Sequence, residues 1–188
     1  MFDRQYGPIE KIKRDHVNRY LFAAERIQRK RVLDLACACG YGSWLLHGAG
    51  NEVTGVDIEP EAIAYAQRHY QGPTYLCQAG EETKGSWEVL VSFETLEHLE
   101  RPQDVLALQV PLIIASVPNE ERYPFSAETF SGDKYPHKRH YTPTEFEQLL
   151  NSAGFEVTEK FCQQDKQHGD IKTGTDGRFL IYVASKNL

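Results

Sequence analysis

The stretch Val32-Leu-Asp-Leu-Ala-Cys-Ala-Cys-Gly-Tyr-Gly-Ser43 decides the predicted fold, because a short apolar run passes into a turn made mostly of small residues. An apolar run of this length indicates a buried strand, and small residues let the backbone approach a ligand before a helix begins. The pattern then repeats, since Glu52-Val-Thr-Gly-Val-Asp57 is a second apolar run and ends in an acid. Two such strands separated by a helical segment predict a parallel sheet.

Strand-like and helix-like segments alternate along the whole chain. Apolar or alternating runs predict strands over residues 31–36, 52–57, 73–77, 87–93, 110–117, 155–161 and 178–184. Amphipathic spacing and cap residues predict helices over residues 8–28, 41–49, 60–70 and 142–153, with a short helix after Pro102. The alternation predicts an α/β fold with a Rossmann-like, doubly wound sheet of seven strands. No helix separates the last two strands, so they should form a hairpin that leaves one antiparallel strand near the C-terminal edge.

The length of 188 residues suits one substantial core, so residues 1–188 are predicted to form a single domain. Residues 1–30 should be an N-terminal helical segment. Residues 118–141 are long, irregular and rich in proline, aromatic and charged residues, which is typical of a loop that covers a substrate.

The composition argues against several classes of protein. A net charge of -6 disfavours a broad nucleic-acid surface. The longest apolar run, 110–117, is far below the roughly 20 residues of a membrane span, and the N-terminus has no apolar stretch after its charges, so a cytoplasmic location is the default. The turn explains Cys37 and Cys39, and no second Cys/His pair follows, so no metal site is predicted. No heptad or apolar stripe is visible, which makes a monomer or weak dimer the default.

A doubly wound sheet binds its ligand beyond the carboxyl ends of its strands, so the residues there are the candidates for a site. The first turn can serve a ligand or only tight packing. Asp57 can accept hydrogen bonds from both hydroxyls of a ribose, or it can cap the helix that begins near Pro60. A dinucleotide oxidoreductase would use the same two features, so they leave the cofactor open.

Three stretches together resemble the class I S-adenosylmethionine-dependent methyltransferases. They are residues 32–43, residues 53–66 with Val53-Thr-Gly-Val-Asp57 and Pro60-Glu-Ala-Ile-Ala-Tyr-Ala66, and Val91-Ser-Phe-Glu-Thr-Leu-Glu-His-Leu99. Residues 19–24 and 140–157 are similar to the small-molecule group that includes the ubiquinone-biosynthesis O-methyltransferases. The resemblance implies transfer of a methyl group from S-adenosylmethionine to a small-molecule acceptor, at oxygen, with S-adenosylhomocysteine as the product.

The resemblance also implies which residues hold the methionine end of the cofactor, namely Asp34, Ala36, Cys37 and Gly40. Arg19 would reach the cofactor carboxylate, unless it is a surface arginine of the leading helix. The family usually has glycine at position 38 and often at position 36. Alanine at 36 should be tolerated easily, but Ala38 would be strained at a positive φ and would narrow the cofactor pocket by one methyl group.

For the nucleoside end, the resemblance implies that Asp57 holds the ribose and that Ile58 lies against the adenine. Gly80 and Glu81 occupy the place where the family meets the adenine edge. The sulfonium would be bordered by Ser92, Phe93 and Glu94.

Methyl transfer is an in-line displacement from an activated donor, so alignment supplies most of the acceleration. Where the acceptor is a hydroxyl, a nearby histidine would help to remove its proton, because the pKa of histidine lies close to neutrality. His98 is the first candidate, although it can also cap or pack the short helix, and His140 is the second. The cluster His137-Lys138-Arg139-His140 favours an anionic acceptor such as a carboxylate or a phosphate.

Two other readings stay open beside a small-molecule enzyme. A nucleic-acid or protein methyltransferase is one, although the fourth strand ends in Ser-Phe-Glu-Thr and lacks the Asn/Asp-Pro-Pro-aromatic element of the amino-group DNA enzymes. A catalytically weak module that binds S-adenosylmethionine is the other. Ala38 and the short connection between Arg101 and Val110 favour it.

Overall fold

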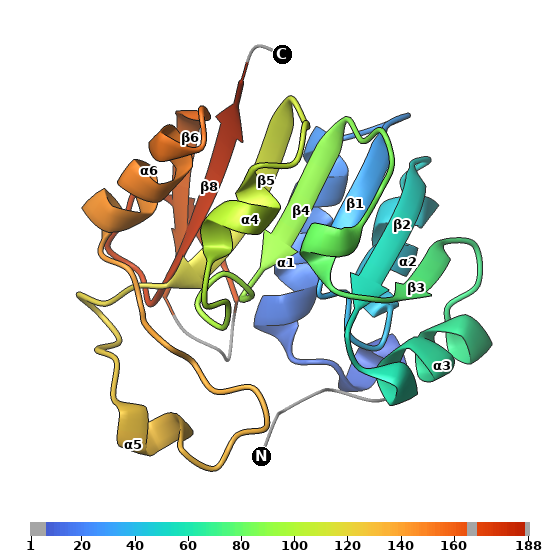
Figure 1. Cartoon of the computed structure of the whole chain (residues 1–188), viewed down its shortest axis with the longest axis horizontal. Helices are drawn as coiled ribbons and strands as arrows, with labels where there is room; N and C mark the ends of the chain where they lie inside the picture. Colours follow the sequence, from blue (N-terminus) through green and yellow to red (C-terminus); the bar gives the residue numbers. More distant parts are fainter. Residues whose placement is uncertain (1–6, 165–168, 187–188) are drawn as a thin grey trace.

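The computed structural model describes residues 7–164 and 169–186, and a single mixed sheet runs through them. Within these residues the sheet has eight strands in the order β3-β2-β1-β4-β5-β8-β6-β7 (Figure 1). The strands are β1 Arg31–Leu35, β2 Glu52–Asp57, β3 Thr74–Cys77, β4 Val89–Phe93, β5 Leu112–Pro118, β6 Glu156–Gln163, β7 Ile171–Thr173 and β8 Phe179–Ser185. The α/β class and the doubly wound order predicted from the sequence are confirmed.

The C-terminal edge of the sheet differs from the prediction. Strands β1 to β5 are parallel, whereas β8 is antiparallel to both β5 and β6. The predicted hairpin of β6 and β8 is present, but β7 adds an eighth strand that is antiparallel to β6. The predictions of seven strands and of one antiparallel strand were therefore wrong. Ile171–Thr173 is short and largely exposed, so main-chain pairing creates this strand without an apolar pattern.

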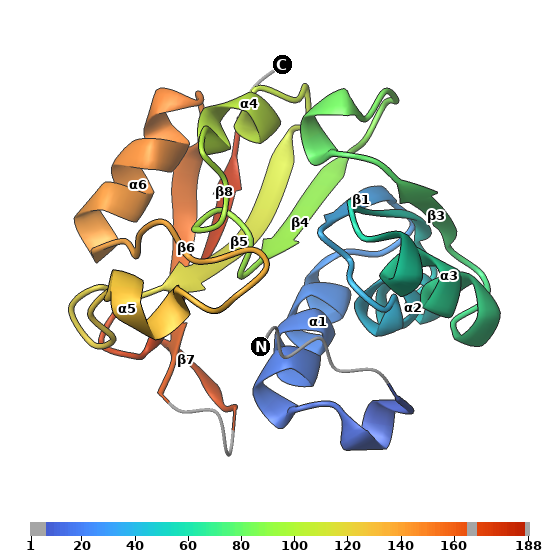
Figure 2. The same cartoon turned by 60° about the horizontal axis from the view of Figure 1, so that its bottom comes forward.

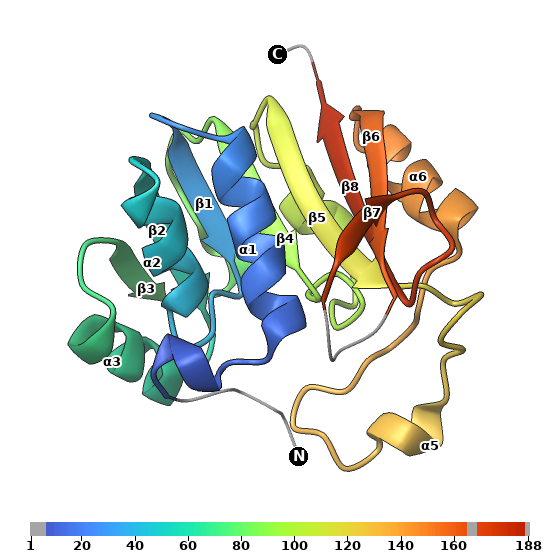
Figure 3. The same cartoon turned by 180° about the vertical axis from the view of Figure 1, so that it is seen from behind.

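Helices cover both faces of the sheet and divide the core into two layers. The helices are α1 Arg14–Arg26, α2 Tyr41–Gly48, α3 Pro60–His69, α4 Pro102–Leu106, α5 Ala127–Phe130 and α6 Pro143–Ser152. Helices α1, α2 and α3 lie on one face (Figure 3), and α4 and α6 lie on the other. Successive strand residues serve opposite layers, since Val32 packs toward α1 and Leu33 packs toward α4 and α6. Burial on both faces explains the continuous apolar runs of the central strands.

Two helix boundaries test the starts that cap residues and apolar spacing predicted from the sequence. The prediction that Thr142 caps a helix is confirmed, because its side chain accepts a hydrogen bond from the Glu145 N–H in a full capping box. The predicted leading helix over 8–28 is instead a 3-10 turn, Ile9–Lys11, followed by α1. The first six residues of the predicted helical segment 1–30 lie outside the described residues. A single domain over 1–188 stays a prediction.

The connection between β5 and α6 is the long irregular segment that the sequence predicted over 118–141, apart from the short helix α5. Figure 2 shows α5 and the chain after it at the end of the sheet where the parallel strands β4 and β5 finish. A bridge between Asn119 and Tyr141 ties the two ends of the segment together. Among the described helices, none has the length and apolar character needed to cross a membrane.

Candidate functional site

A cavity of about 730 Å³ opens at the carboxyl edge of the sheet, between the ends of β1, β2 and β4 and the segment from Tyr123 to Lys138. This volume lies within the range of about 300–1,000 Å³ that is typical of small-molecule sites. Ten of the predicted site residues line it, and they are Arg19, Ala36, Cys37, Asp57, Ile58, Gly80, Glu81, Phe93, Glu94 and His98. The predicted residues Asp34, Gly40, Ser92 and His140 do not line it.

The turn after β1 has an unusual backbone at two alanines. Ala36 has φ 57° and Ala38 has φ 49°, both in the left-handed region that costs a residue with a Cβ about 1–2 kcal/mol. Ala38 therefore has the positive φ at which an alanine was predicted to be strained. The expectation that alanine at 36 is tolerated easily was wrong, since it has the same conformation.

The end of this turn needs a glycine for reasons of packing. Gly40 has φ 86°, and a Cβ there would lie 2.5 Å from the Ala66 Cβ and 2.9 Å from the Tyr75 ring. Gly40 thus lets α2 begin close to α3 and stands behind the cavity wall. Its place in the turn supports packing rather than a direct contact with a ligand.

Asp57 joins the first two strand ends. Its Oδ2 accepts a hydrogen bond from the Ala38 N–H at 3.0 Å, and its Oδ1 accepts one from the Glu59 N–H at 2.8 Å. Glu59 is the N-cap residue of α3, so Asp57 lies two residues before the helix, and its bond to the Glu59 N–H supports the turn that leads into α3. A carboxylate has about four acceptor positions, and Asp57 can therefore accept from the hydroxyls of a ribose while it keeps these two bonds.

Asp34 lies inside β1 and points away from the cavity. It is fully buried and accepts hydrogen bonds from the Tyr20 hydroxyl at 3.0 Å and the Ser43 hydroxyl at 2.6 Å. Burial raises the pKa of Asp34 to about 7, although both hydrogen bonds act against the rise. The side chain holds α1 and α2 against β1, because a strand directs residue 34 to the same face as Val32.

Arg19 is a buried cation at the wall of the cavity. Only 1% of its surface is exposed, so its reading as a surface arginine of the leading helix was wrong. A guanidinium N–H donates to the Gln163 Oε1 at 2.6 Å, and the guanidinium lies 3.9 Å from the Asp15 carboxylate one turn earlier. Gln163 in turn donates to the backbone oxygens of Asp15 and Gly169, which fixes α1 against β6.

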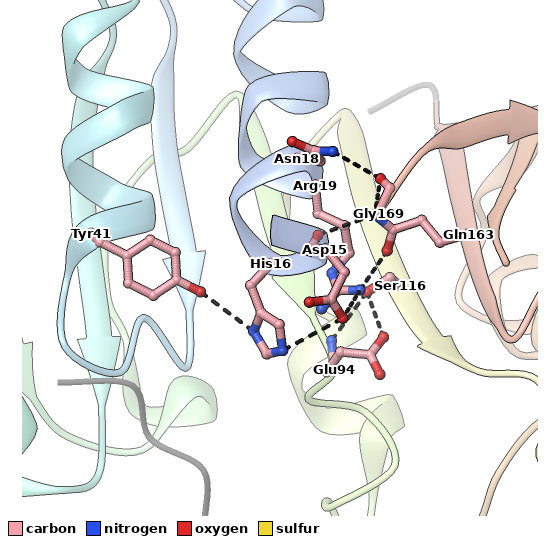
Figure 4. Close-up of polar contacts among 9 residues, drawn as sticks. All are labelled: Asp15, His16, Asn18, Arg19, Tyr41, Glu94, Ser116, Gln163 and Gly169. Atoms are coloured by element: carbon pink, nitrogen blue, oxygen red, sulfur yellow. Dashed lines mark hydrogen bonds and ion pairs between the residues drawn. The ribbon is translucent and has the colours of Figure 1, made fainter. Parts of the chain in front are cut away.

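Glu94 follows β4 in a left-handed conformation, with φ 50°. Its N–H donates to the Ser116 carbonyl at 3.0 Å, and the Ser116 hydroxyl donates to its Oε1 at 2.7 Å (Figure 4). Next to it, the ring of Phe93 packs edge-on against the Tyr20 ring at 5.0 Å between centroids. The end of β4 therefore presents one aromatic ring and one oriented carboxylate to the cavity.

The two candidate histidines lie in different surroundings. His98 lines the cavity, where its ring meets that of His137 edge-on at 4.5 Å between centroids. His140 is buried behind them, with its Nδ1 2.5 Å from the Tyr123 carbonyl and its Nε2 2.8 Å from the His137 Nδ1. Burial lowers the pKa of His140 below its ordinary value, despite the opposing hydrogen bond to the Tyr123 carbonyl. His98 thus lies at the cavity, and His140 orients a neighbour.

The segment that covers the cavity is attached to the residues that follow β4. The Lys138 N–H donates to the Glu97 carbonyl at 2.8 Å, and the Lys138 ammonium pairs with Glu100 at 2.6 Å. The Arg139 guanidinium donates to the Leu99 carbonyl at 3.2 Å. The basic cluster on which an anionic acceptor was predicted therefore contributes to holding this segment.

Several cavity residues were missed by the sequence reading. They are Lys13, His16, Tyr20, Tyr41, Gln78, Tyr123, Phe130 and Tyr135, among others. Those of α1 lie on its inner face, which the apolar period of residues 8–28 could have indicated. Those of the covering segment had no such signal, because an irregular chain has no period.

Comparisons with known proteins agree on one family. A family model described as a methyltransferase domain matches residues 8–160. Among curated proteins, the chain is similar to a ubiquinone biosynthesis O-methyltransferase of Burkholderia cenocepacia, with 30% identity over 103 residues that make up 50% of this chain and 44% of the relative. The chain thus spans less than half the length of that relative.

Two solved structures share the fold. One is an S-adenosylmethionine-dependent methyltransferase of Thermotoga maritima, described as a possible histamine N-methyltransferase, with TM-score 0.74, 18% identity, and coverage of 93% of this chain and 90% of that one. The other is the 1,6-didemethyltoxoflavin N1-methyltransferase of Burkholderia thailandensis with S-adenosylhomocysteine bound, with TM-score 0.69, 18% identity, and coverage of 96% and 81%.

Proposed function

The chain belongs to the class I S-adenosylmethionine-dependent methyltransferase family, and from this premise we propose that it transfers the methyl group of S-adenosylmethionine to a hydroxyl oxygen of a small molecule. The observation that carries the proposal is the cavity at the ends of β1, β2 and β4, with Asp57 in its wall. S-adenosylmethionine supplies a methyl group on a positively charged sulfur, which makes that carbon ready for attack.

The residues around the cavity fit this cofactor in three places. Asp57 accepts from the ribose hydroxyls, and Ile58 and Gly80 border the adenine on the same side of the cavity. At the other side, Arg19 pairs with the carboxylate of the methionine end, because a buried guanidinium favours a planar anion. Glu94 borders the sulfonium, where its carboxylate would offset the positive charge.

The acceptor binds under the covering segment, beside the rings of Tyr123, Phe130 and Tyr135. These rings exclude water and orient an aromatic or apolar body, so that the acceptor oxygen faces the methyl carbon in line with the bond that breaks. His98 assists the loss of the hydroxyl proton, and His140 acts as a positioning residue through His137. An anionic acceptor stays a prediction.

Isothermal titration calorimetry with S-adenosylmethionine tests the cofactor, using the wild type, Asp57→Ala and the exposed control His69→Gln. We expect binding in the wild type and the control and weaker binding in Asp57→Ala. A screen of hydroxylated aromatic acceptors for release of S-adenosylhomocysteine then tests the reaction. Absent binding in both the wild type and Ala38→Gly would refute the proposal.

A catalytically weak module that binds S-adenosylmethionine is the second candidate. The observation in its favour is the pair of Cβ atoms at Ala36 and Ala38, which lie in the left-handed turn that lines the cavity. It predicts cofactor binding without release of S-adenosylhomocysteine for every acceptor in the screen. Turnover with any acceptor excludes it.

A further inference from the structure

Glu97 carries one of the buried carboxyl groups of the described residues. It is fully buried, and neither of its carboxylate oxygens has a hydrogen-bond partner within that part. The nearby Glu94 carboxylate opposes a second negative charge at this position. A buried carboxyl group without a partner costs several kcal/mol, and a ligand that binds to it would offset that cost.

Two histidines lie beside this carboxyl group. One ligand atom each from Glu97, His98 and His137 lies within 4.8 Å of the other two. Ligand atoms on one ion lie about 3–3.6 Å apart when each metal bond is about 2.0–2.2 Å long, so small side-chain rotations would bring these three into place. The sequence showed no such group, because His137 lies in the covering segment, far along the chain from Glu97.

A backbone hydrogen bond and the side chain of His140 hold Glu97, His98 and His137 in this arrangement. The hydrogen bond from the Lys138 N–H to the Glu97 carbonyl keeps His137 next to the end of β4. A carbonyl accepts only, so a neutral His140 carries its proton on Nδ1 toward Tyr123 and accepts at Nε2 from His137. This assigns the proton of neutral His137 to Nδ1 and leaves its Nε2 as a metal-binding lone pair.

We propose that Glu97, His98 and His137 form a binding site for a divalent first-row transition-metal cation at the acceptor end of the cavity. Two imidazoles and one carboxylate are a donor set that such ions prefer over Mg²⁺, which takes oxygen ligands. Three protein ligands also leave at least one position open, as in catalytic zinc sites. The cation offsets the repulsion between Glu97 and Glu94.

The metal site would take part in the proposed methyl transfer, and its role in catalysis rests on that proposed function. A hydroxyl oxygen of the acceptor takes the open position and loses its proton to water, because a bound cation lowers the pKa of a coordinated oxygen. The oxygen then forms the new bond to the methyl carbon as the carbon–sulfur bond breaks, and the sulfonium becomes a neutral thioether. His98 therefore assists the loss of the proton as a ligand of the cation and does not itself accept the proton. The acceptor class is a molecule with a hydroxyl that can coordinate the cation.

Equilibrium dialysis of tag-free protein, stripped with a chelator and then exposed to Zn²⁺, tests the site. We expect one Zn²⁺ per chain in the wild type. Glu97→Gln and His137→Gln should each weaken its binding by more than about 100-fold, and His140→Ala by about 10- to 100-fold, as for an outer partner. His69→Gln, an exposed histidine on α3, should bind as the wild type does. Co²⁺ should give visible absorption in the wild type and lose it in Glu97→Gln.

Thermal unfolding separates loss of the site from loss of the fold. Zn²⁺ should raise the melting temperature of the wild type and leave that of Glu97→Gln unchanged, because a ligand stabilises only a state that binds it. Absence of bound Zn²⁺, or equal affinity in Glu97→Gln, would overturn the metal site. Binding of S-adenosylmethionine is measured on the same samples, so that it can fail or succeed independently of the metal.

Discussion

The buried carboxyl group of Asp34 should make the protein less stable as the pH rises from about 5 to 8. Burial raises its pKa to about 7 in the folded protein, whereas an aspartate in an unfolded chain has a pKa of about 3.9. Between these values the folded state keeps a proton that the unfolded state has lost. Since the folded state binds more protons there, the free energy of unfolding falls as the pH rises.

The magnitude follows from the width of this window. From pH 5 to pH 7 the folded state holds about one proton more than the unfolded state, and each pH unit then lowers the free energy of unfolding by about 1.4 kcal/mol. Over these two units Asp34 should remove on the order of 2–3 kcal/mol of stability. Asp34→Asn abolishes the titration and keeps the shape of the side chain. The Tyr20 hydroxyl can still donate to the amide oxygen, and the Ser43 hydroxyl can rotate to accept from the amide nitrogen.

Urea unfolding of the wild type and Asp34→Asn at pH 5, 6, 7 and 8 measures this effect, because titrations common to both proteins cancel in the difference. The stability of the wild type relative to Asp34→Asn should fall by about 2–3 kcal/mol and level off near pH 8. Asp170→Asn removes an exposed carboxylate and should show no such slope. A difference constant within about 0.5 kcal/mol across the series would refute the reasoning, because the hydrogen bonds would then offset the desolvation.

Three further predictions concern the walls of the cavity and the segment that covers it. Asp57→Ala should weaken S-adenosylmethionine binding by about 1–3 kcal/mol in calorimetry and lower the melting temperature, since the Ala38 and Glu59 N–H groups lose their acceptor; unchanged affinity would remove Asp57 from the site. Ala38→Gly should raise the free energy of unfolding by about 0.5–1 kcal/mol, because glycine removes the strain of the left-handed backbone. Arg29→Gly, at an exposed position that is also left-handed, is the control and should raise the free energy of unfolding by a similar amount. Only Ala38→Gly should change cofactor affinity. Lys134→Met removes the ion pair between the covering segment and Glu59, which follows the cavity residue Ile58. This change should speed both association and release of the cofactor in stopped flow, with less than about a threefold change in affinity; unchanged rates would mean that the pair does not control access to the cavity.

The sequence predicts most of the fold because the signals that define it are local. Gly40 and Pro60 mark where helices begin after strands, and Thr142 caps α6 as predicted. The central strands are buried on both faces and show as apolar runs. The errors arise where no local signal exists. Strand β7 forms by pairing with β6, and nothing in the residues after Lys11 marks the break before α1.

The site was predictable where topology alone places a residue. Ala36, Asp57 and Glu94 end neighbouring parallel strands, so they reach one edge of the sheet. The direction of a side chain was harder, although the alternation along β1 already sends Asp34 to the α1 face. Contacts across the covering segment could not be predicted at all. The approach of His137 to His98 depends on a loop whose path is set by tertiary hydrogen bonds.

Several ionisable side chains are buried in this fold although their burial lowers its stability. Arg19 and Asp57 line the cavity, Asp15 lies beside Arg19, and Glu97 lies beside His98. Each buried charge or buried carboxyl group costs free energy, and apolar residues in these places would make a more stable protein. Asp34 is buried inside β1 and holds two helices, whereas these four groups gather at the edge of the sheet where the parallel strands end. Their concentration around one cavity is the pattern of a site that binds and aligns a charged ligand.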